Sequence, residues 1–262
     1  MGPIPTCRAQ MKTHIHASAL LLAICSSGAW AQNTPNIDWS GFHAGGFLGA
    51  AHGHSDARTV TGRLQYFVEE DAVQIARAGD NKLGQSNVSG GLSLGWDKQF
   101  DRLLVGVEAS ANSLSFDKER VRGEVYDSVP GTSFSIRQSV RASWMSAVRL
   151  RLGWAQQNWL AYVSGGVAHT KVKLNVTLTD NAFDGFSKAS TSESVTGPTV
   201  GFGGEYALDS KWSIRGDYHY TRFGSINAVS DVTSTNNSGG TLLHKADLIV
   251  HGAFVGLNYR FR

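Results

Sequence analysis

The segment VRLRLGWAQQNWLAYVSGG (residues 148–166) holds two runs of side chains that alternate in polarity and meet at a short polar turn. Before the turn, Leu150 and Leu152 occupy every second position, and Arg149 and Arg151 precede each of them. Successive side chains of a β-strand point to opposite faces, so a period of two predicts a strand with one apolar and one charged face. The segment therefore predicts two antiparallel strands whose charges share one face.

The same arrangement, followed each time by a long hydrophilic stretch, recurs from residue 86 to the C-terminus. The other copies read GWDKQFDRLLVGVEA, GGEYALDSKWSIRGDY and GAFVGLNYRFR. Strands are expected at residues 39–50, 86–98, 103–114, 142–154, 159–171, 197–208, 211–223 and 246–261. Short turns on one side, long loops on the other and aromatic residues at the turns are typical of transmembrane barrels. The sequence thus predicts an all-β fold, an eight-stranded antiparallel up-and-down transmembrane β-barrel with short periplasmic turns.

Four hydrophilic stretches are expected to form long extracellular loops. They cover about residues 51–85, 115–141, 172–196 and 224–244. The first contains VEEDAVQIARAG, for which we expect a short helix, and the last contains TSTNNSGG, expected to form a loop tip.

Charged residues fall on one face of the predicted strands, which we expect to line the interior of the barrel, its lumen. The first strand is too rich in glycine for its faces to be assigned. The expected luminal charges are Glu108, Arg149, Arg151, Glu205, Arg215, Asp217 and Arg260.

Aromatic residues on the apolar faces cluster beside the short turns and the C-terminus, as in the girdles of membrane barrels. This predicted periplasmic girdle comprises Trp96, Trp154, Trp159, Tyr206, Trp212, Tyr259 and Phe261. At the opposite strand ends, Trp144, Phe116, Tyr220 and Phe223 are expected to form an outer girdle. A soluble antiparallel barrel or sandwich would also alternate, but its apolar face would point inward and its turns would not need repeated aromatic residues.

The N-terminal residues 1–31 have the features of a signal peptide. Lys12 precedes the apolar run ASALLLAIC, and Ala29-Trp30-Ala31 forms an A-x-A cleavage site. Met11 lies directly before Lys12 and is the expected start of translation. Cleavage would leave residues 32–262 as the barrel domain of an outer-membrane protein.

Composition excludes several kinds of function. Both cysteines, Cys7 and Cys25, fall within the expected signal peptide, so no disulfide framework or cysteine metal site is expected in the barrel. Setting aside Arg8 and Lys12 leaves 22 basic and 21 acidic residues. No clustered basic footprint for nucleic acid is present.

The segments DWSGFHAGGFLGA, VRLRLGWAQQNWLAYVSGGVA, GPTVGFGGEYALDSKWSIRGDYHY and FVGLNYRF resemble the small porin-family surface antigens of alphaproteobacteria. That group includes opacity-like outer-membrane barrels and hemin-binding members. The resemblance covers most of the chain from residue 38 onward outside the four hydrophilic stretches. It implies an outer-membrane location in a Gram-negative bacterium and an envelope-structural or weak porin-like role. One departure is Arg262, which follows the terminal aromatic Phe261.

The luminal charges allow two interpretations. In a narrow eight-stranded barrel they can form a salt-bridged network that closes the lumen, or they can line a gate or ion pathway. We expect the closed network.

The histidines are the second candidate. His52 and His54 form an H-x-H motif, and His244 lies near the end of the fourth hydrophilic stretch. Imidazole nitrogens at these positions could bind heme iron or a transition metal. The alternative is that they are solvated histidines without a ligand. The alternative function of the chain is accordingly loop-mediated binding of hemin or a host-surface component.

Enzymatic activity is not expected, and neither is a cofactor. His219 with Thr221, or His54 with Ser55, supplies residue types for nucleophilic catalysis but no recognisable motif. The expected partners are the lipid bilayer, lipopolysaccharide through Lys118, Arg120 and Arg122, and the insertion machinery that reads the C-terminal strand.

Overall fold

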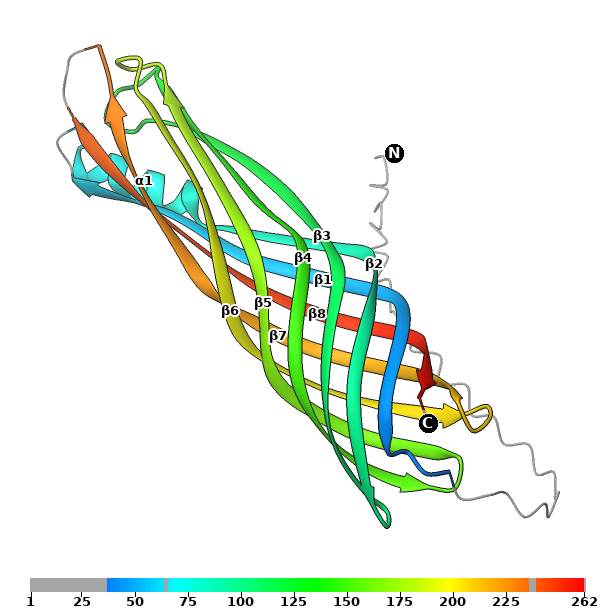
Figure 1. The fold of residues 1–262 in the computed structure, drawn as a ribbon. Helices are drawn as coiled ribbons and strands as arrows, with labels where there is room; N and C mark the ends of the chain where they lie inside the picture. Colours follow the sequence, from blue (N-terminus) through cyan, green and yellow to red (C-terminus); the bar gives the residue numbers. More distant parts are fainter. Residues whose placement is uncertain (1–36, 64–65, 236–238, 262) are drawn as a thin grey trace, which may run out of the picture. The chain divides into compact units, whose positions relative to one another are not determined.

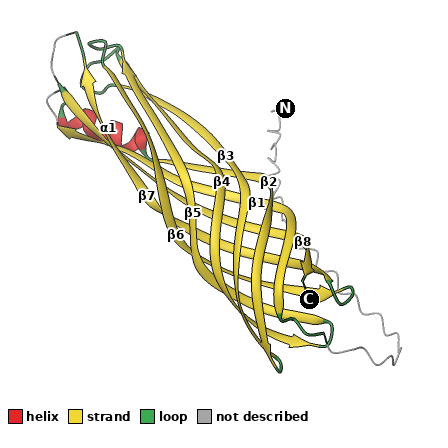
Figure 2. Ribbon diagram, in the orientation of Figure 1, coloured by secondary structure: helices red, strands yellow, loops and turns green. Residues whose placement is uncertain are grey.

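The computed structural model describes residues 37–63, 66–235 and 239–261, which form one closed β-barrel with a single short helix (Figures 1 and 2). The elements are β1 (Gly41–Arg63), α1 (Glu69–Gly79), β2 (Asn81–Phe100), β3 (Leu103–Val125), β4 (Ser133–Gln156), β5 (Trp159–Asp180), β6 (Phe186–Ala207), β7 (Trp212–Thr233) and β8 (Gly240–Arg260). The expected signal peptide, its cleavage site and Met11 lie outside the described residues, as do parts of the expected tip TSTNNSGG.

Each strand pairs antiparallel with its neighbours in sequence, and β1 pairs with β8 to close the ring. The prediction of an eight-stranded up-and-down barrel is therefore confirmed. Two of the short turns consist of two residues each, 101–102 and 157–158. Asp101 and Gln157 adopt φ values of 53° and 50°, the left-handed conformation that tight turns between antiparallel strands require.

The strands are much longer than expected, between 20 and 24 residues each. Most of the four predicted loops belong to strands, so those loop boundaries were wrong. The actual connections at this end are residues 64–80, which include α1, and residues 126–132, 181–185 and 234–239. A run of 20 to 24 residues at about 3.3 Å per residue exceeds what a tilted strand needs to cross a bilayer. Each strand therefore continues past the membrane into an extension of the barrel.

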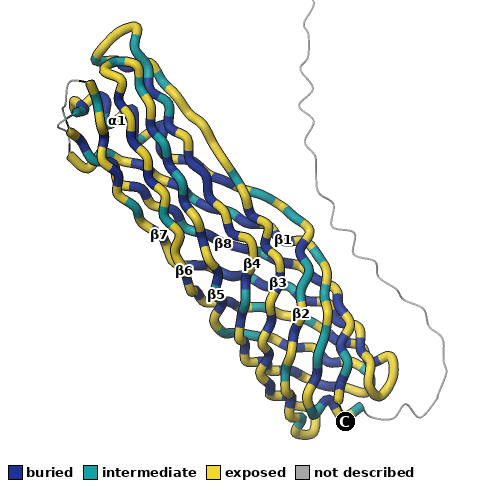
Figure 3. Tube along the Cα trace, turned by 45° about the horizontal axis from the view of Figure 1, so that its top comes forward, coloured by how far each residue is buried: buried dark blue, intermediate teal, exposed yellow. Residues whose placement is uncertain are grey.

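Buried and exposed residues alternate along the strands from one end of the barrel to the other (Figure 3), but the polarity of the two faces reverses in this extension. In the membrane zone of β5, Val163 and Val167 face outward and are exposed. Further along β5, Val172 and Leu174 are buried inside while Lys173 between them faces outward. The average composition of the extension is polar. From the sequence, these residues were therefore predicted to form hydrophilic loops, and the alternating pattern of strands was not recognised.

A large apolar cluster fills the extension. Phe116, Phe134, Ile136, Leu178 and their neighbours form one group of buried side chains. This corrects the outer girdle in part, because Phe116 and Phe223 are 2% and 3% exposed and belong to the interior cluster. Trp144 does face outward, as predicted.

The predicted short helix is confirmed as α1, and it lies at the end of the barrel away from the short turns (Figure 1). It packs against β1, β3 and β4. β2 pairs with β3 only from Gly91 to Phe100, and beyond that point α1 bonds to the end of β3. Gln74 Nε2 donates to Val125 O at 2.9 Å, and Arg77 forms an ion pair with Glu124. Among the described residues, no helix has the length and hydropathy to cross a membrane.

Candidate functional site

The seven charged residues predicted for the lumen all point into the barrel, and none is more than 8% exposed. They come from β3, β4, β6, β7 and β8, because alternation places every second side chain of each strand inside. The structure brings them together as one group, here called the charged network.

Arg151 on β4 lies at the centre of the charged network and is 1% exposed. Its Nη1 lies 3.2 Å from Asp97 Oδ2 and 3.8 Å from Glu108 Oε2, and its Nη2 lies 2.5 Å from Glu205 Oε1. The guanidinium also lies over the ring of Tyr162, 4.1 Å from its centroid, a cation–π contact. Since the three carboxylates belong to β2, β3 and β6, the contacts of this one side chain cross the interior.

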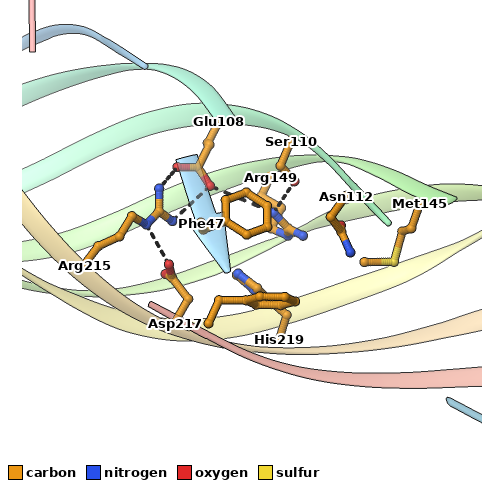
Figure 4. Close-up of a pocket in the computed structure, with 10 residues that line it drawn as sticks. Phe47, Glu108, Ser110, Asn112, Met145, Arg149, Arg215, Asp217 and His219 are labelled. Atoms are coloured by element: carbon orange, nitrogen blue, oxygen red, sulfur yellow. Dashed lines mark hydrogen bonds and ion pairs between the residues drawn. The ribbon is translucent and has the colours of Figure 1, made fainter. Parts of the chain in front are cut away.

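Arg215 on β7 forms a second centre (Figure 4). Its Nη1 lies 2.6 Å from Glu108 Oε2, and its Nε lies 2.6 Å from Asp217 Oδ2. Arg149 donates to Ser110 Oγ at 2.9 Å and lies 3.9 Å from Glu108 Oε1. Glu108 therefore links arginines of two strands, as a buried charge needs partners to offset its desolvation.

Arg260 on β8 joins the charged network to the chain preceding β1. Its Nη1 lies 3.6 Å from Asp97 Oδ2 and its Nη2 lies 3.9 Å from Glu205 Oε2. It also donates to the carbonyl oxygen of Trp39, and its guanidinium lies 5.2 Å from the centroid of the Trp39 ring. Trp39 is 1% exposed and fills the periplasmic end of the interior.

Sequence reasoning missed Asp97 and His43, which both belong to the charged network. Asp97 lies in the expected strand 86–98 but was not counted among the luminal charges, although the outward orientation of Trp96 next to it implies an inward Asp97. His43 lies in the glycine-rich first strand, and its Nε2 accepts from Arg151 Nη1 at 3.1 Å. With Asp97 included, four arginines face four carboxylates among the described residues, so the formal charges balance.

A small cavity lies where the charged network meets the apolar cluster (Figure 4). Phe47, Met145 and Phe254 form its apolar side, and Arg149 and His219 lie on its polar side. About 10 Å³ is available to the centre of a water molecule, which is room for about one water.

Asp180 organises the extracellular end of the barrel. It accepts from the hydroxyl of Tyr66 at 2.8 and 2.9 Å and from the hydroxyl of Tyr126 at 3.3 Å. Burial, and then the neighbouring Asp180 carboxylate, raise the pKa of both tyrosines above the ordinary value, so both hydroxyls keep their protons and donate. Asp180 also accepts from the backbone N–H groups of Ala182 and Gly185, so one carboxylate connects three connecting segments.

The three predicted histidine ligands do not come together as one set. His52 and His54 lie on the outward face of β1, whereas His244 points inward and is 3% exposed. His244 is bonded at both nitrogens, to Thr59 Oγ1 at 3.0 Å and Ser230 Oγ at 2.8 Å. Burial lowers the pKa of His244, which lies in the extension beyond the membrane zone, to about 4. The prediction that all three histidines form one ligand site is therefore wrong.

The predicted periplasmic girdle faces outward around the turns. Trp96, Trp154, Trp159, Tyr206, Trp212 and Phe261 are between 42% and 54% exposed. Tyr259 is half-buried because it packs edge-to-face against Trp212 and Phe261, with ring centroids 5.0 and 5.1 Å apart.

An antiparallel barrel with an apolar outer band, aromatic residues at its turns and charges inside is the structure of an outer-membrane barrel protein. Residues 17–261 match the family described as outer membrane protein beta-barrel domain, and the chain belongs to that family. It is located in the outer membrane of a Gram-negative bacterium.

The chain is similar to outer-membrane surface antigens. It is 28% identical to a 31 kDa outer-membrane immunogenic protein of Brucella melitensis, covering 90% of this chain and 89% of that protein. It is 26% identical to a 25 kDa outer-membrane immunogenic protein of Brucella canis, covering 87% and 81%. Among solved structures, the outer-membrane protein OprG of Pseudomonas aeruginosa aligns with a TM-score of 0.42 at 13% identity, covering 85% and 97%.

Proposed function

We propose that this protein is a structural and surface barrel of the outer membrane whose lumen is closed by the charged network. The observation that carries the proposal is Arg151, which is buried and contacts carboxylates on three other strands across the interior. The lumen of an eight-stranded barrel is about as wide as its side chains can fill. A side chain that bridges it leaves no path for ions.

Two further features support closure. Beyond the charged network, the cavity at Phe47 and Phe254 has room for about one water, and the apolar cluster follows. Hydrated ions do not enter apolar interiors, because desolvating a charge there costs several kcal/mol. An open pore would require both zones to rearrange.

The histidine pairs considered for catalysis do not form a nucleophile and base. His54 faces outward whereas Ser55 is buried inside, so the wall separates them. The hydroxyl of Thr221 donates to Thr199 Oγ1 at 2.9 Å rather than to His219. These contacts support a non-enzymatic protein.

Two partners at the surface were expected from the sequence, lipopolysaccharide and the insertion machinery. Lys118, Arg120 and Arg122 share the face of β3 that carries the buried Phe116, and they pair with the inward-facing Val140, Gln138 and Ile136 of β4; Arg120 and Arg122 are nevertheless exposed. Asp117 and Glu119 on the opposite face are already paired with arginines of β4. A contact with lipopolysaccharide phosphates, which lie around the outer face, is therefore not supported by the position of these three side chains. The aromatic end of β8 suits recognition by the insertion machinery.

Single-channel recording tests the proposal. Protein purified from outer membranes is reconstituted into planar bilayers, and no steady openings are expected. Glu205→Lys should open a path, because it replaces the partner of Arg151 with a like charge. Glu193→Lys, an exposed position on the same strand, should remain silent. Steady openings of defined size in the unmodified protein would make it a small porin and overturn the closed lumen.

A further inference from the structure

Two outward-facing histidines on β1 lie beside a glycine on β2 at the outer end of the membrane zone. In the register of the two strands, His54 is opposite Gly84 and His52 is opposite Ser86. Both imidazoles are on the outer surface of the barrel, where His52 is exposed and His54 is partly exposed.

One nitrogen of each ring is already bonded. His52 Nδ1 lies 2.8 Å from Ser86 Oγ, and His54 Nε2 lies 3.1 Å from Asp56 Oδ1. Within the described part of the chain, His52 Nε2 and His54 Nδ1 have no hydrogen-bond partner. A carboxylate on the far nitrogen of an imidazole fixes the tautomer and raises the basicity of the other nitrogen, as is common for metal-binding histidines.

The two unbonded nitrogens converge on the same place. A Cβ atom added to Gly84 would lie 3.8 Å from His52 Nε2 and 4.0 Å from His54 Nδ1, and its three nearest neighbouring atoms all belong to these two histidines. Glycine therefore leaves open a space that both nitrogens face. A transition-metal ion binds imidazole nitrogen at about 2.0–2.1 Å, so small rotations of the two rings would bring them to one ion.

We propose that His52 and His54 bind a divalent transition-metal ion, Cu²⁺, Ni²⁺ or Zn²⁺, over Gly84 on the outer surface of the barrel. Asp56 Oδ1 lies 3.1 Å from Nε2 of His54, so one carboxylate adds negative charge beside the ligand that would hold the cation. Imidazole is a preferred ligand of these three ions.

The site supplies two protein ligands, and water completes the coordination. No group of three or more histidine, cysteine, aspartate or glutamate side chains among the described residues is arranged to hold a metal. Structural metal sites use four protein ligands, whereas open positions permit exchange. The ion bound here is therefore exchangeable with the surroundings of the cell.

The test is isothermal titration of the untagged protein, purified from outer membranes in detergent, with CuCl₂, NiCl₂ or ZnCl₂ alone. One ion per barrel is expected. His52→Ala or His54→Ala should each weaken binding at least about tenfold, because loss of a residue that only orients a metal ligand already weakens binding by about that factor. Gly84→Val should weaken binding equally while keeping both histidines, since its side chain fills the space. The electron paramagnetic resonance spectrum of bound Cu²⁺ should show two imidazole nitrogen ligands in the unmodified protein.

His169→Ala is the matched control. His169 is an outward-facing histidine on β5 that lies 3.3 Å from Thr196 Oγ1 and packs against Trp144, and its loss should leave the titration unchanged. Absence of binding in the unmodified protein would overturn the proposal. Unchanged binding in Gly84→Val would also overturn it. The same holds if His169→Ala weakens binding as much as His52→Ala or His54→Ala does. Since all the variants lie on the outer surface, heat-modified migration in electrophoresis can confirm that each barrel is folded.

Discussion

Neutralising Glu205 tests whether the charged network holds the barrel together. Glu205 accepts from Arg151 Nη2 at 2.5 Å, from Ser213 Oγ at 3.1 Å and from Asn258 Nδ2 at 3.2 Å, and it is 3% exposed. Glu205→Gln keeps the shape of the side chain but removes its charge. Arg151 then faces a neutral amide at its shortest contact.

The magnitude follows from this imbalance. Removing one partner of a buried ion pair costs about 3–5 kcal/mol, because the remaining charge is buried without compensation. Arg151 keeps Asp97 at 3.2 Å and Glu108 at 3.8 Å, so we expect the lower part of this range, about 3 kcal/mol. Glu193→Gln, at an exposed position of the same strand, should stay within about 0.5 kcal/mol of the unmodified protein.

The assay is equilibrium urea unfolding in lipid vesicles, followed by the fluorescence of the tryptophans that face the membrane. The double variant Arg151→Gln with Glu205→Gln restores the charge balance. Its loss of stability should therefore be smaller than the sum of the two single losses, by about 0.5–3 kcal/mol. A loss below about 1 kcal/mol for Glu205→Gln, or strict additivity in the double variant, would refute the reasoning.

Three further predictions concern other parts of the wall. Leu150→Arg places a charge on the lipid face and should make folding into bilayers less favourable by about 2–4 kcal/mol. Thr177→Arg, which faces outward in the extension, should have little effect, and equal effects of the two changes would contradict the assigned membrane zone. Phe116→Ala should cost about 3–5 kcal/mol in urea unfolding, because Phe116 lies inside the apolar cluster rather than in a lipid-facing girdle. Burial lowers the pKa of His244 to about 4, so the unfolded chain takes up a proton at higher pH than the folded one. Stability should fall as pH drops from about 6.5 towards 4, and His244→Gln should flatten that part of the profile.

The membrane zone could be predicted from the sequence because two independent signals coincide there. Alternation assigned Arg149 and Arg215 to the inside, and the aromatic residues at the turns assigned the direction of the barrel. Asp97 was missed because a residue next to a turn lacks a second neighbour to confirm its parity. His43 was missed because glycines on both sides of a strand remove the contrast on which parity depends.

The partners of each charge could not be predicted, and neither could the convergence of His52 and His54 over Gly84. Both depend on register and on the curvature of the closed barrel, which bring together residues far apart in the sequence. The sequence placed the H-x-H motif in an expected loop, and only the pairing of β1 with β2 shows that the two imidazoles share one face with a glycine beside them.

The outer boundary of the membrane can be located on a single strand. On β5, inward positions change from Tyr162, which contacts the charged network, to the buried apolar Val172. Outward positions change from Val167 to Lys171 over four residues. A strand in lipid is stabilised when its apolar side chains face outward and its polar groups are satisfied inside. A strand in water is stabilised when its apolar side chains are buried inside and its polar side chains face outward. Since β5 pairs with β4 beyond this point as well, the change in solvent explains the reversal, and His169 between Val167 and Lys171 marks the level at which lipid gives way to water.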